Sequence, residues 1–255
     1  MAEEPEGAAR LTFRGAPTCP SELNGNGRTM SGVFALGTAI FWTIAYILII
    51  RAGLREQTFG MPIVAFAMNI SWEFCFAFIR PTAGIQQWVN VIWFALDCAV
   101  GYTVVRYGPR EFPFLGRRLF YPALLGLLAL AYVGMNEASL QFDGGRSSIT
   151  GFGDNLAMSG LFLALFAARG GDRGQSVGIA AAKLLGTACA SLTLLTSTYH
   201  QNPQDKTPLI HYMYFTCLVL DLAYVAALVL YRRTRRPSLL DSELGAGRGM
   251  ERQWT

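Results

Sequence analysis

Residues 60–79 read GMPIVAFAMNISWEFCFAFI, an apolar stretch in which Glu73 is the only charged side chain. About 20 apolar residues are long enough to cross the hydrocarbon core of a bilayer as a helix. A charge at that depth costs several kcal/mol, so intramembrane carboxyl groups usually face the protein interior and mark a pathway or an active site. Asp97 and Asp221 repeat the pattern in two other apolar stretches. The stretch therefore predicts a transmembrane helix and a functional site.

Composition supports a membrane protein. The chain has 255 residues, of which 52% are hydrophobic and 15% are charged, whereas soluble domains carry about 25% charged residues. The net charge of +4 is spread between apolar segments rather than gathered in one patch, so no nucleic-acid partner is indicated. The basic residues are nearly all Arg, which favours a bacterial protein. We expect a multi-pass protein of a bacterial cytoplasmic membrane, and the sequence indicates no oligomeric state.

Seven apolar segments predict an all-α, integral membrane bundle of seven transmembrane helices. The segments are residues 30–50, 60–79, 87–105, 119–136, 149–168, 176–198 and 209–231. Together they define one transmembrane domain over residues 30–231. Residues 1–29 are polar and rich in Gly and Pro, which predicts a disordered tail, and residues 232–255 predict a flexible basic and polar tail.

The distribution of basic residues predicts the orientation of this bundle. Twelve Arg residues fall in the loops and tail on one side, against six basic residues on the other, and the alternation holds loop by loop. Cytoplasmic loops carry the excess of Lys and Arg. We therefore expect the N-terminus outside and the C-terminus in the cytoplasm.

The three intramembrane carboxyl groups are the candidate chemical groups. Helix rise places Glu73, Asp97 and Asp221 in the middle band of the membrane, where they could line one cavity. Desolvation disfavours the charged form, so a protonated acid can persist near neutral pH, as a general acid requires. The alternative is that each neutral carboxyl group only forms a hydrogen bond to a neighbouring helix.

Polar and aromatic neighbours accompany two of these acids. Asn69 lies one turn before Glu73, and Trp72 adjoins it. The amide could orient the carboxyl group and the indole could face a cation, or both could serve only packing. Tyr214 and Tyr224 share the helix of Asp221 and are candidates for steering a cation, although such aromatic residues more often belong to a core.

Polar residues also occur in the fifth and sixth segments. Asn155 and Ser159 lie one turn apart on one face, within a Gly-rich stretch over residues 136–159 that indicates a loop entering a helix, and both are candidate supporting residues of the site. Lys183 is expected to snorkel to the cytoplasmic surface.

The sequence lacks the motifs of several common classes of reaction. The sequence contains no DDxxD run, P-loop, GxSxG or HExxH, and its two His residues have no partners at metal-ligand spacing. We therefore expect no metal and no cofactor. The remaining class of reaction is acid catalysis on a long hydrocarbon substrate, although buried carboxyl groups suit a proton-coupled transporter equally well. A receptor is a further non-enzymatic alternative, but the DRY and NPxxY signatures are absent.

Residues 61–78, MPIVAFAMNISWEFCFAF, resemble the small seven-helix membrane terpene cyclases of fungal meroterpenoid and indole-diterpene pathways and their actinobacterial relatives. Asn69, Trp72 and Glu73 carry this likeness. Further similar stretches are WTIAYILIIRAGLREQTFG at residues 42–60, WFALD at 93–97, NLAMS at 155–159 and CLVLDLAYV at 217–225.

The resemblance implies a function. It assigns Glu73 and Asp221 as catalytic acids and leaves Asp97 a supporting role. It implies cyclisation of a prenyl chain, started by protonation of a terminal alkene or epoxide, without metal. Its bacterial branch implies a lipophilic, farnesylated indole or diketopiperazine as substrate, and an enzyme of the isomerase or intramolecular lyase type that works in the lipid bilayer.

Overall fold

The computed structural model describes residues 25–196 and 207–235, and these residues form helices joined by short connections. In chain order the elements are α1 (Gly25–Glu56), α2 (Ile63–Phe74), the π-helical turn η1 (Cys75–Ile79), α3 (Ile85–Glu111), α4 (Gly116–Asp143), α5 (Ser148–Arg169), α6 (Val177–Thr196) and α7 (Pro208–Arg235). Each predicted segment coincides with one of the α-helices, with η1 continuing the second.

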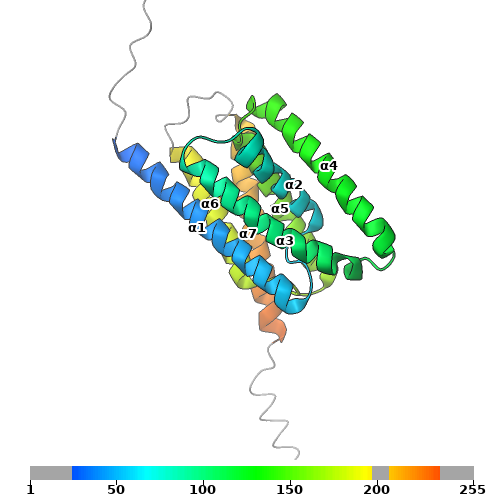
Figure 1. Ribbon diagram of the computed structural model, residues 1–255. Helices are drawn as coiled ribbons and strands as arrows, with labels where there is room; N and C mark the ends of the chain where they lie inside the picture. The colour runs from blue at the N-terminus through cyan, green and yellow to red at the C-terminus, as the bar shows by residue number, and fades with distance from the viewer. Residues whose placement is uncertain (1–24, 197–206, 236–255) are drawn as a thin grey trace, which may run out of the picture.

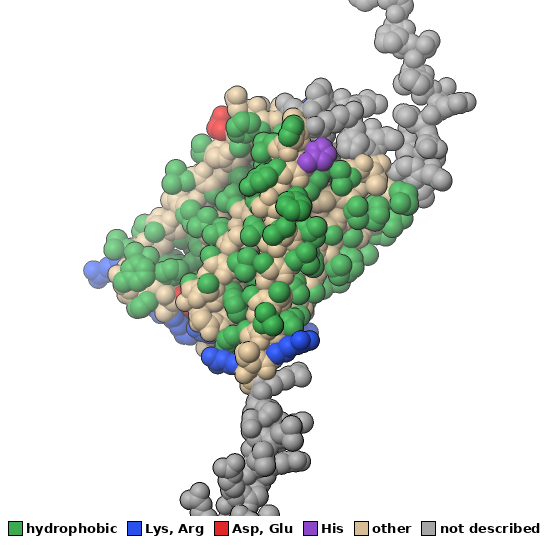
Figure 2. All heavy atoms as spheres, turned by 180° about the vertical axis from the view of Figure 1, so that it is seen from behind, with side chains coloured by type: hydrophobic (Ala, Val, Ile, Leu, Met, Phe, Trp, Pro, Cys, Tyr) green, Lys and Arg blue, Asp and Glu red, His purple; other side chains and the backbone are tan. Residues whose placement is uncertain are grey.

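The helices have the lengths and surfaces of membrane spans. Among the described residues, six helices are long and apolar enough to cross a bilayer, and Ile63–Ile79 forms a shorter apolar helix. Large apolar side chains cover the sides of the bundle (Figure 2), and Leu125 and Leu130 are examples on α4. A surface of this kind is stable in contact with lipid and not in water. The prediction of an all-α, seven-helix membrane bundle is confirmed.

Several helix boundaries differ from the sequence prediction, among them the start of α1 and the end of α4. Helix α1 begins at Gly25 rather than at residue 30. Helix α4 continues to Asp143, so most of the predicted loop before the fifth helix is helical. Its apolar pattern fades before the helix ends, which is why the boundary was placed too early. The tails at residues 1–24 and 236–255, and the stretch 197–206 with His200, lie outside the described residues.

The second span changes its winding directly after Glu73. The α-helical part ends at Phe74, and η1 continues with π-helical hydrogen bonds such as that from Arg80 N to Cys75 O, at 2.7 Å. The side chain of Asn90 on α3 donates to the carbonyl of Phe76 at 3.3 Å and thereby holds the turn. Single π-helical turns inside α-helices occur frequently at functional sites.

The helices pack side by side, with α2 in contact with α3, α4 and α5. Helix α1 packs along α6, and α4 stands at the edge of the bundle, where it contacts α2 and α5 (Figure 1). The main apolar core joins side chains of all seven α-helices, among them Tyr46, Phe66, Val100 and Tyr224. The acids described below therefore lie inside a continuous protein interior.

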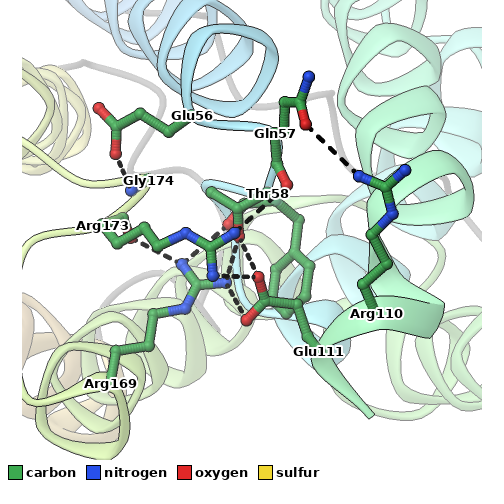
Figure 3. A network of polar contacts seen from close by, with 9 residues as sticks. Glu56, Gln57, Thr58, Arg110, Glu111, Arg169, Arg173 and Gly174 are labelled. Atoms are coloured by element: carbon green, nitrogen blue, oxygen red, sulfur yellow. Dashed lines mark hydrogen bonds and ion pairs between the residues drawn. The ribbon is translucent and has the colours of Figure 1, made fainter. Parts of the chain in front are cut away.

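Basic side chains gather at the end of the bundle where α7 ends (Figure 2). At this end the carboxylate of Glu111 binds three side chains from other connections: Thr58 Oγ1 donates to it at 2.8 Å, Arg173 Nη1 lies at 2.8 Å and Arg169 Nη2 at 3.7 Å (Figure 3). The network fixes the α1–α2 and α5–α6 connections to the end of α3. Which side of the membrane this end faces stays a prediction.

Gly60 allows the α1–α2 connection to approach the α5–α6 connection closely. A Cβ atom at this position would lie 2.8 Å from Gly174 O and 3.0 Å from Ile49 O. Both are backbone atoms, which cannot rotate away. We expect Gly60→Ala to lower the free energy of unfolding by about 1–3 kcal/mol, measured by thermal or denaturant unfolding in detergent. Gly126→Ala is the control, because nothing lies within 4 Å of its Cβ position. Equal stability of the two variants would contradict the close approach.

Candidate active site

A hydrogen-bonded group joins α1, α2 and α3 in the interior of the bundle. The side-chain amide of Asn69 donates one hydrogen bond to Asp97 Oδ2 at 2.6 Å and another to the hydroxyl of Tyr46. Asp97 is fully buried and Asn69 is 6% exposed. The amide was expected to orient Glu73, but it binds Asp97 instead, because helix α3 presents its carboxyl group to the same face of α2.

Glu73 lies in the same region and is also buried. Its side chain is 2% exposed, and its Oε2 atom has no hydrogen bond among the described residues. It lies near enough to Asp97 and to Asp154 on α5 for their charges to interact. None of the three forms an ion pair within residues 25–196 and 207–235, so three carboxyl groups share an interior region without a bound cationic side chain.

Asp221 on α7 has different surroundings, because it is paired with Lys183 on α6. The Lys183 Nζ atom lies 2.7 Å from Asp221 Oδ1, and each side chain is 1% exposed. The expectation that Lys183 snorkels to the surface is wrong, since a carboxylate within reach provides a better partner for a buried ammonium group than a distant interface. The expectation that Asp221 lines one cavity with Glu73 and Asp97 is not met either.

Residues of α5 and α6 complete the shell of this ion pair. Lys183 Nζ donates to Ser159 Oγ at 2.6 Å and to Asn155 Oδ1 at 3.3 Å, and Asn155 Nδ2 donates to Thr187 Oγ1 at 3.1 Å. Ser159 Oγ also donates to the carbonyl of Asn155 at 2.9 Å. Asn155 and Ser159 thus share a face, as predicted, and their function here is to bind an ammonium group.

A partly open cavity of ≈ 220 Å³ lies between α1, α2, α3, α5 and α6. Its wall combines aromatic, small and polar side chains, and it runs from mid-bundle residues to the helix ends opposite the Arg-rich end. The residues that line it are Ala35, Thr38, Ala39, Trp42, Tyr46, Asn69, Trp72, Gln86, Trp93, Ser147, Ser148, Gly151, Phe152, Asp154, Asn155, Met158, Ala190, Thr193 and Leu194. Asp154 is the one carboxyl group among these described residues.

Two glycines make room for the indole rings in this wall. A Cβ atom on Gly151 of α5 would lie 3.0 Å from Trp72 Cζ2, and one on Gly186 of α6 would lie 2.7 Å from Trp42 Cδ1. The rings therefore lie directly against the backbone of neighbouring helices. The third indole, that of Trp93, is fixed by a hydrogen bond from Nε1 to Thr43 Oγ1 at 3.1 Å.

The start of α5 is fixed by a carboxyl group from α4. Asp143 is fully buried, and it accepts hydrogen bonds from the backbone N–H groups of Ile149 and Thr150, each at 2.8 Å. A carboxylate at a helix N-terminus satisfies free N–H groups and interacts favourably with the helix dipole. This contact sets the position of α5, and hence the depth at which Asp154 enters the cavity.

The predicted site residues therefore fall in several places. Asn69, Trp72 and Asn155 line the cavity, Glu73 and Asp97 lie behind its wall, and Ser159 and Asp221 belong to the ion-pair group. The two Tyr residues lie outside the lining: Tyr214 packs on Phe152 with ring centroids 4.5 Å apart, and Tyr224 packs on Phe162 at 5.6 Å.

Sequence reasoning missed Trp42, Tyr46, Trp93 and Asp154 as lining residues. Trp93 lies one turn before Asp97, and Trp42 lies one turn before Tyr46, so helical spacing could have indicated both pairs. The depth of Asp154 in the membrane could not be predicted, because the sequence does not show where its helix begins. Within the described residues, no group of three or more His, Cys, Asp or Glu side chains has the arrangement of a metal site.

These features define a multi-pass membrane protein with an acid-bearing, aromatic cavity between its helices. The family of Pyr4-like transmembrane terpene cyclases matches residues 17–234. The chain belongs to this family, and the prediction from the resemblance is confirmed. No solved structure matches the chain.

Named relatives are terpene cyclases of fungi. The chain is 28% identical over 220 residues to terpene cyclase dpasB of Apiospora sacchari, which covers 83% of this chain and 90% of that protein. It is 27% identical over 217 residues to terpene cyclase pyr4 of Aspergillus fumigatus, with 80% and 87% covered. The Pyr4-family terpene cyclase mfmH of Annulohypoxylon moriforme is 26% identical over 196 residues, with 73% and 80% covered. These relatives give no support to the predicted bacterial membrane.

The ion pair between Lys183 and Asp221 is expected to stabilise the folded protein. Removing one partner leaves a buried charge without compensation, which costs about 3–5 kcal/mol. We expect Lys183→Met and Asp221→Asn each to lower the free energy of unfolding in detergent by about this amount. The double variant should lose much less than the sum of the single losses, because it buries no unpaired charge. Additive losses would show that the two side chains do not stabilise each other.

Proposed function

We propose that the protein cyclises a prenyl chain by protonating its terminal alkene or epoxide inside the cavity. One observation carries this proposal: an aromatic cavity lies beside three buried carboxyl groups without a bound cationic side chain, in a member of a terpene cyclase family. The substrate class we propose is a lipophilic prenylated small molecule, with a farnesylated indole or diketopiperazine as the first candidate.

The dimensions of the cavity support binding of the prenyl end. At ≈ 220 Å³ it is smaller than the roughly 300–1,000 Å³ of typical ligand sites. It therefore suits part of a substrate, with the remainder at the open end. Gln86, Ser147 and Ser148 line the cavity at the starts of α3 and α5 and offer hydrogen bonds to a polar head group. The apolar chain would extend past the indole rings toward Asn69 and Asp154.

The reaction is balanced without a co-substrate. With an alkene, a carboxylic O–H bond breaks and a C–H bond forms at the terminal double bond, which leaves a tertiary cation. With an epoxide, the proton goes to oxygen as the C–O bond opens. Internal alkenes then form the ring C–C bonds. A carboxylate finally accepts a proton from the carbon next to the last cation, so the product is an isomer of the substrate. No divalent metal is needed, because a proton rather than a departing diphosphate starts the reaction.

The cavity wall suits a travelling positive charge. The cavity is lined by Trp42, Trp72 and Trp93, and aromatic rings attract cations by about 2 kcal/mol each when water is excluded. These rings also provide no nucleophile that would trap the cation. Of the acids implied by the resemblance, Glu73 belongs to the unpaired group near the cavity. The pairing of Asp221 with Lys183 favours a supporting role for Asp221 over that of proton donor.

The test is the conversion of a farnesylated indole by membranes that contain the protein, followed by mass spectrometry and chromatography. We expect the wild type to form a cyclised isomer and Glu73→Gln to lower the rate by about a hundredfold, because it removes an acid from the unpaired group beside the cavity and a small displacement of catalytic groups can cost about 10²-fold. Glu137→Gln is the matched control, since it makes the same change at an exposed position on α4.

The outcomes of this assay distinguish a cyclase from a transporter. Full activity of Glu73→Gln at normal expression would remove Glu73 from the acid group. A wild-type protein that moves protons or solute across vesicles but forms no cyclised product from farnesylated indoles or prenylated phenols would contradict the proposed function and favour a transporter.

A further inference from the structure

We propose that Asp154 is the catalytic acid that contacts the substrate and delivers the first proton. This inference rests on the proposed function and names its reacting group. Neither the sequence pattern nor the family resemblance assigned a function to this residue. It lies on α5, one and a half turns after the helix begins, where the wall of the cavity is formed.

Asp154 has the position that a proton donor requires. It lines the cavity, yet the residue is only 4% exposed, so it is shielded from bulk water while it forms part of the wall. Its Oδ1 atom is buried without a hydrogen-bonding partner among the described residues. A buried polar atom without a partner needs an explanation, and a catalytic function is one of the established ones.

The other intramembrane acids lack this combination. Glu73 and Asp97 do not line the cavity, and Asp97 already accepts a hydrogen bond from Asn69 at 2.6 Å. Asp221 is held by Lys183 Nζ at 2.7 Å and lies in the ion-pair group. A proton must pass over hydrogen-bonding distance to the reacting atom. Asp154 is therefore the carboxyl group placed to make that contact.

The carboxyl groups of Glu73 and Asp97 are among the ionisable groups near Asp154. The charges of Glu73 and Asp97 interact with that of Asp154 from α2 and α3, and the charge of Lys183 interacts with it from α6. Nearby carboxyl groups disfavour a second negative charge in the same region. Glu73 and Asp97 therefore lie close to Asp154 without lining the cavity themselves.

Proton transfer from Asp154 to the substrate conserves atoms and electrons. Its O–H bond breaks while a C–H bond forms at the terminal alkene, or while an epoxide oxygen takes the proton and its C–O bond opens. The electron pair of the O–H bond remains on the Asp154 carboxylate. That carboxylate then lies beside the cationic end of the chain, until a proton from the last cation restores an acid in the group.

The first experiment compares three variants under the farnesylated-indole assay. We expect Asp154→Asn, which keeps the shape but removes the acid, to lower the rate at least about a hundredfold with an unchanged unfolding midpoint. Asp154→Glu should restore part of the activity, because it returns an acid to the cavity. Asp172→Asn makes the same chemical change outside the membrane interior and should leave the rate unchanged. Activity of Asp154→Asn near that of the wild type would overturn the inference.

The second experiment locates contact without depending on turnover. A farnesylated indole with a photoreactive diazirine on its terminal isoprene unit is bound to the wild-type protein and irradiated. The diazirine loses N₂, and the carbene inserts into a nearby O–H or C–H bond. Trypsin then separates the candidates: Asp154 lies in the peptide of residues 147–169, and Asp221 lies in 207–232. Glu73 and Asp97 share the peptide 56–106, because Pro81 prevents cleavage after Arg80.

We expect the label on peptide 147–169, at Asp154, and its loss from that residue in Asp154→Asn. A label at Glu73, Asp97 or Asp221, with none on Asp154, would overturn the inference and leave the proposed function intact, provided that the wild type still cyclises the unlabelled substrate. Labelling of Asp154 by a protein that forms no cyclised product would instead show a binding site and contradict the proposed function, on which this inference rests.

Discussion

The central constraint on this molecule is the cost of placing charged groups in the interior of a membrane-spanning bundle. Lys183 and Asp221 meet it by pairing, and Ser159 and Asn155 bind the remaining protons of the ammonium group. Glu73, Asp97 and Asp154 have no cationic side chain bound among the described residues, so their neutral, protonated forms are favoured. The ion-pair group thus stabilises the contacts between helices, while the second group places unpaired acids beside a cavity.

The cavity depends on the same helices that satisfy this constraint. Helix α5 contributes to both groups, because Asp154 faces the cavity and Ser159 binds Lys183. Glycines on α5 and α6 let the indoles of Trp72 and Trp42 lie against backbone, and both rings line the cavity. The π-helical turn after Glu73 ends the second span. A short span, flat aromatic walls and a fixed α5 together give a space suited to a hydrocarbon chain and a proton.

Much of the fold could be predicted from the sequence, because uncharged runs of membrane-spanning length carry a strong signal. The pattern around Asn69, Trp72 and Glu73 likewise indicated both a site and a family. The partners across helices could not be predicted: a lone Lys183 in an apolar segment looks like a snorkelling residue until α7 is known to place Asp221 beside it. Asp154 was missed for a related reason, since its depth depends on the contact of Asp143 with the start of α5. Rotation and depth of helices are tertiary properties that periodicity alone leaves open.

The origin of the proton is the most direct test of the account. The protein is equilibrated in deuterium oxide, mixed in excess with an alkene-terminated farnesylated indole, and stopped within one turnover, so that no proton returned by substrate is reused. Mass spectrometry and deuterium NMR then locate the label. A cyclised product with one deuterium bound to the terminal dimethyl-bearing unit is the result that protonation by an exchangeable carboxyl group requires. A cyclised product without carbon-bound deuterium would contradict proton-initiated cyclisation by this protein.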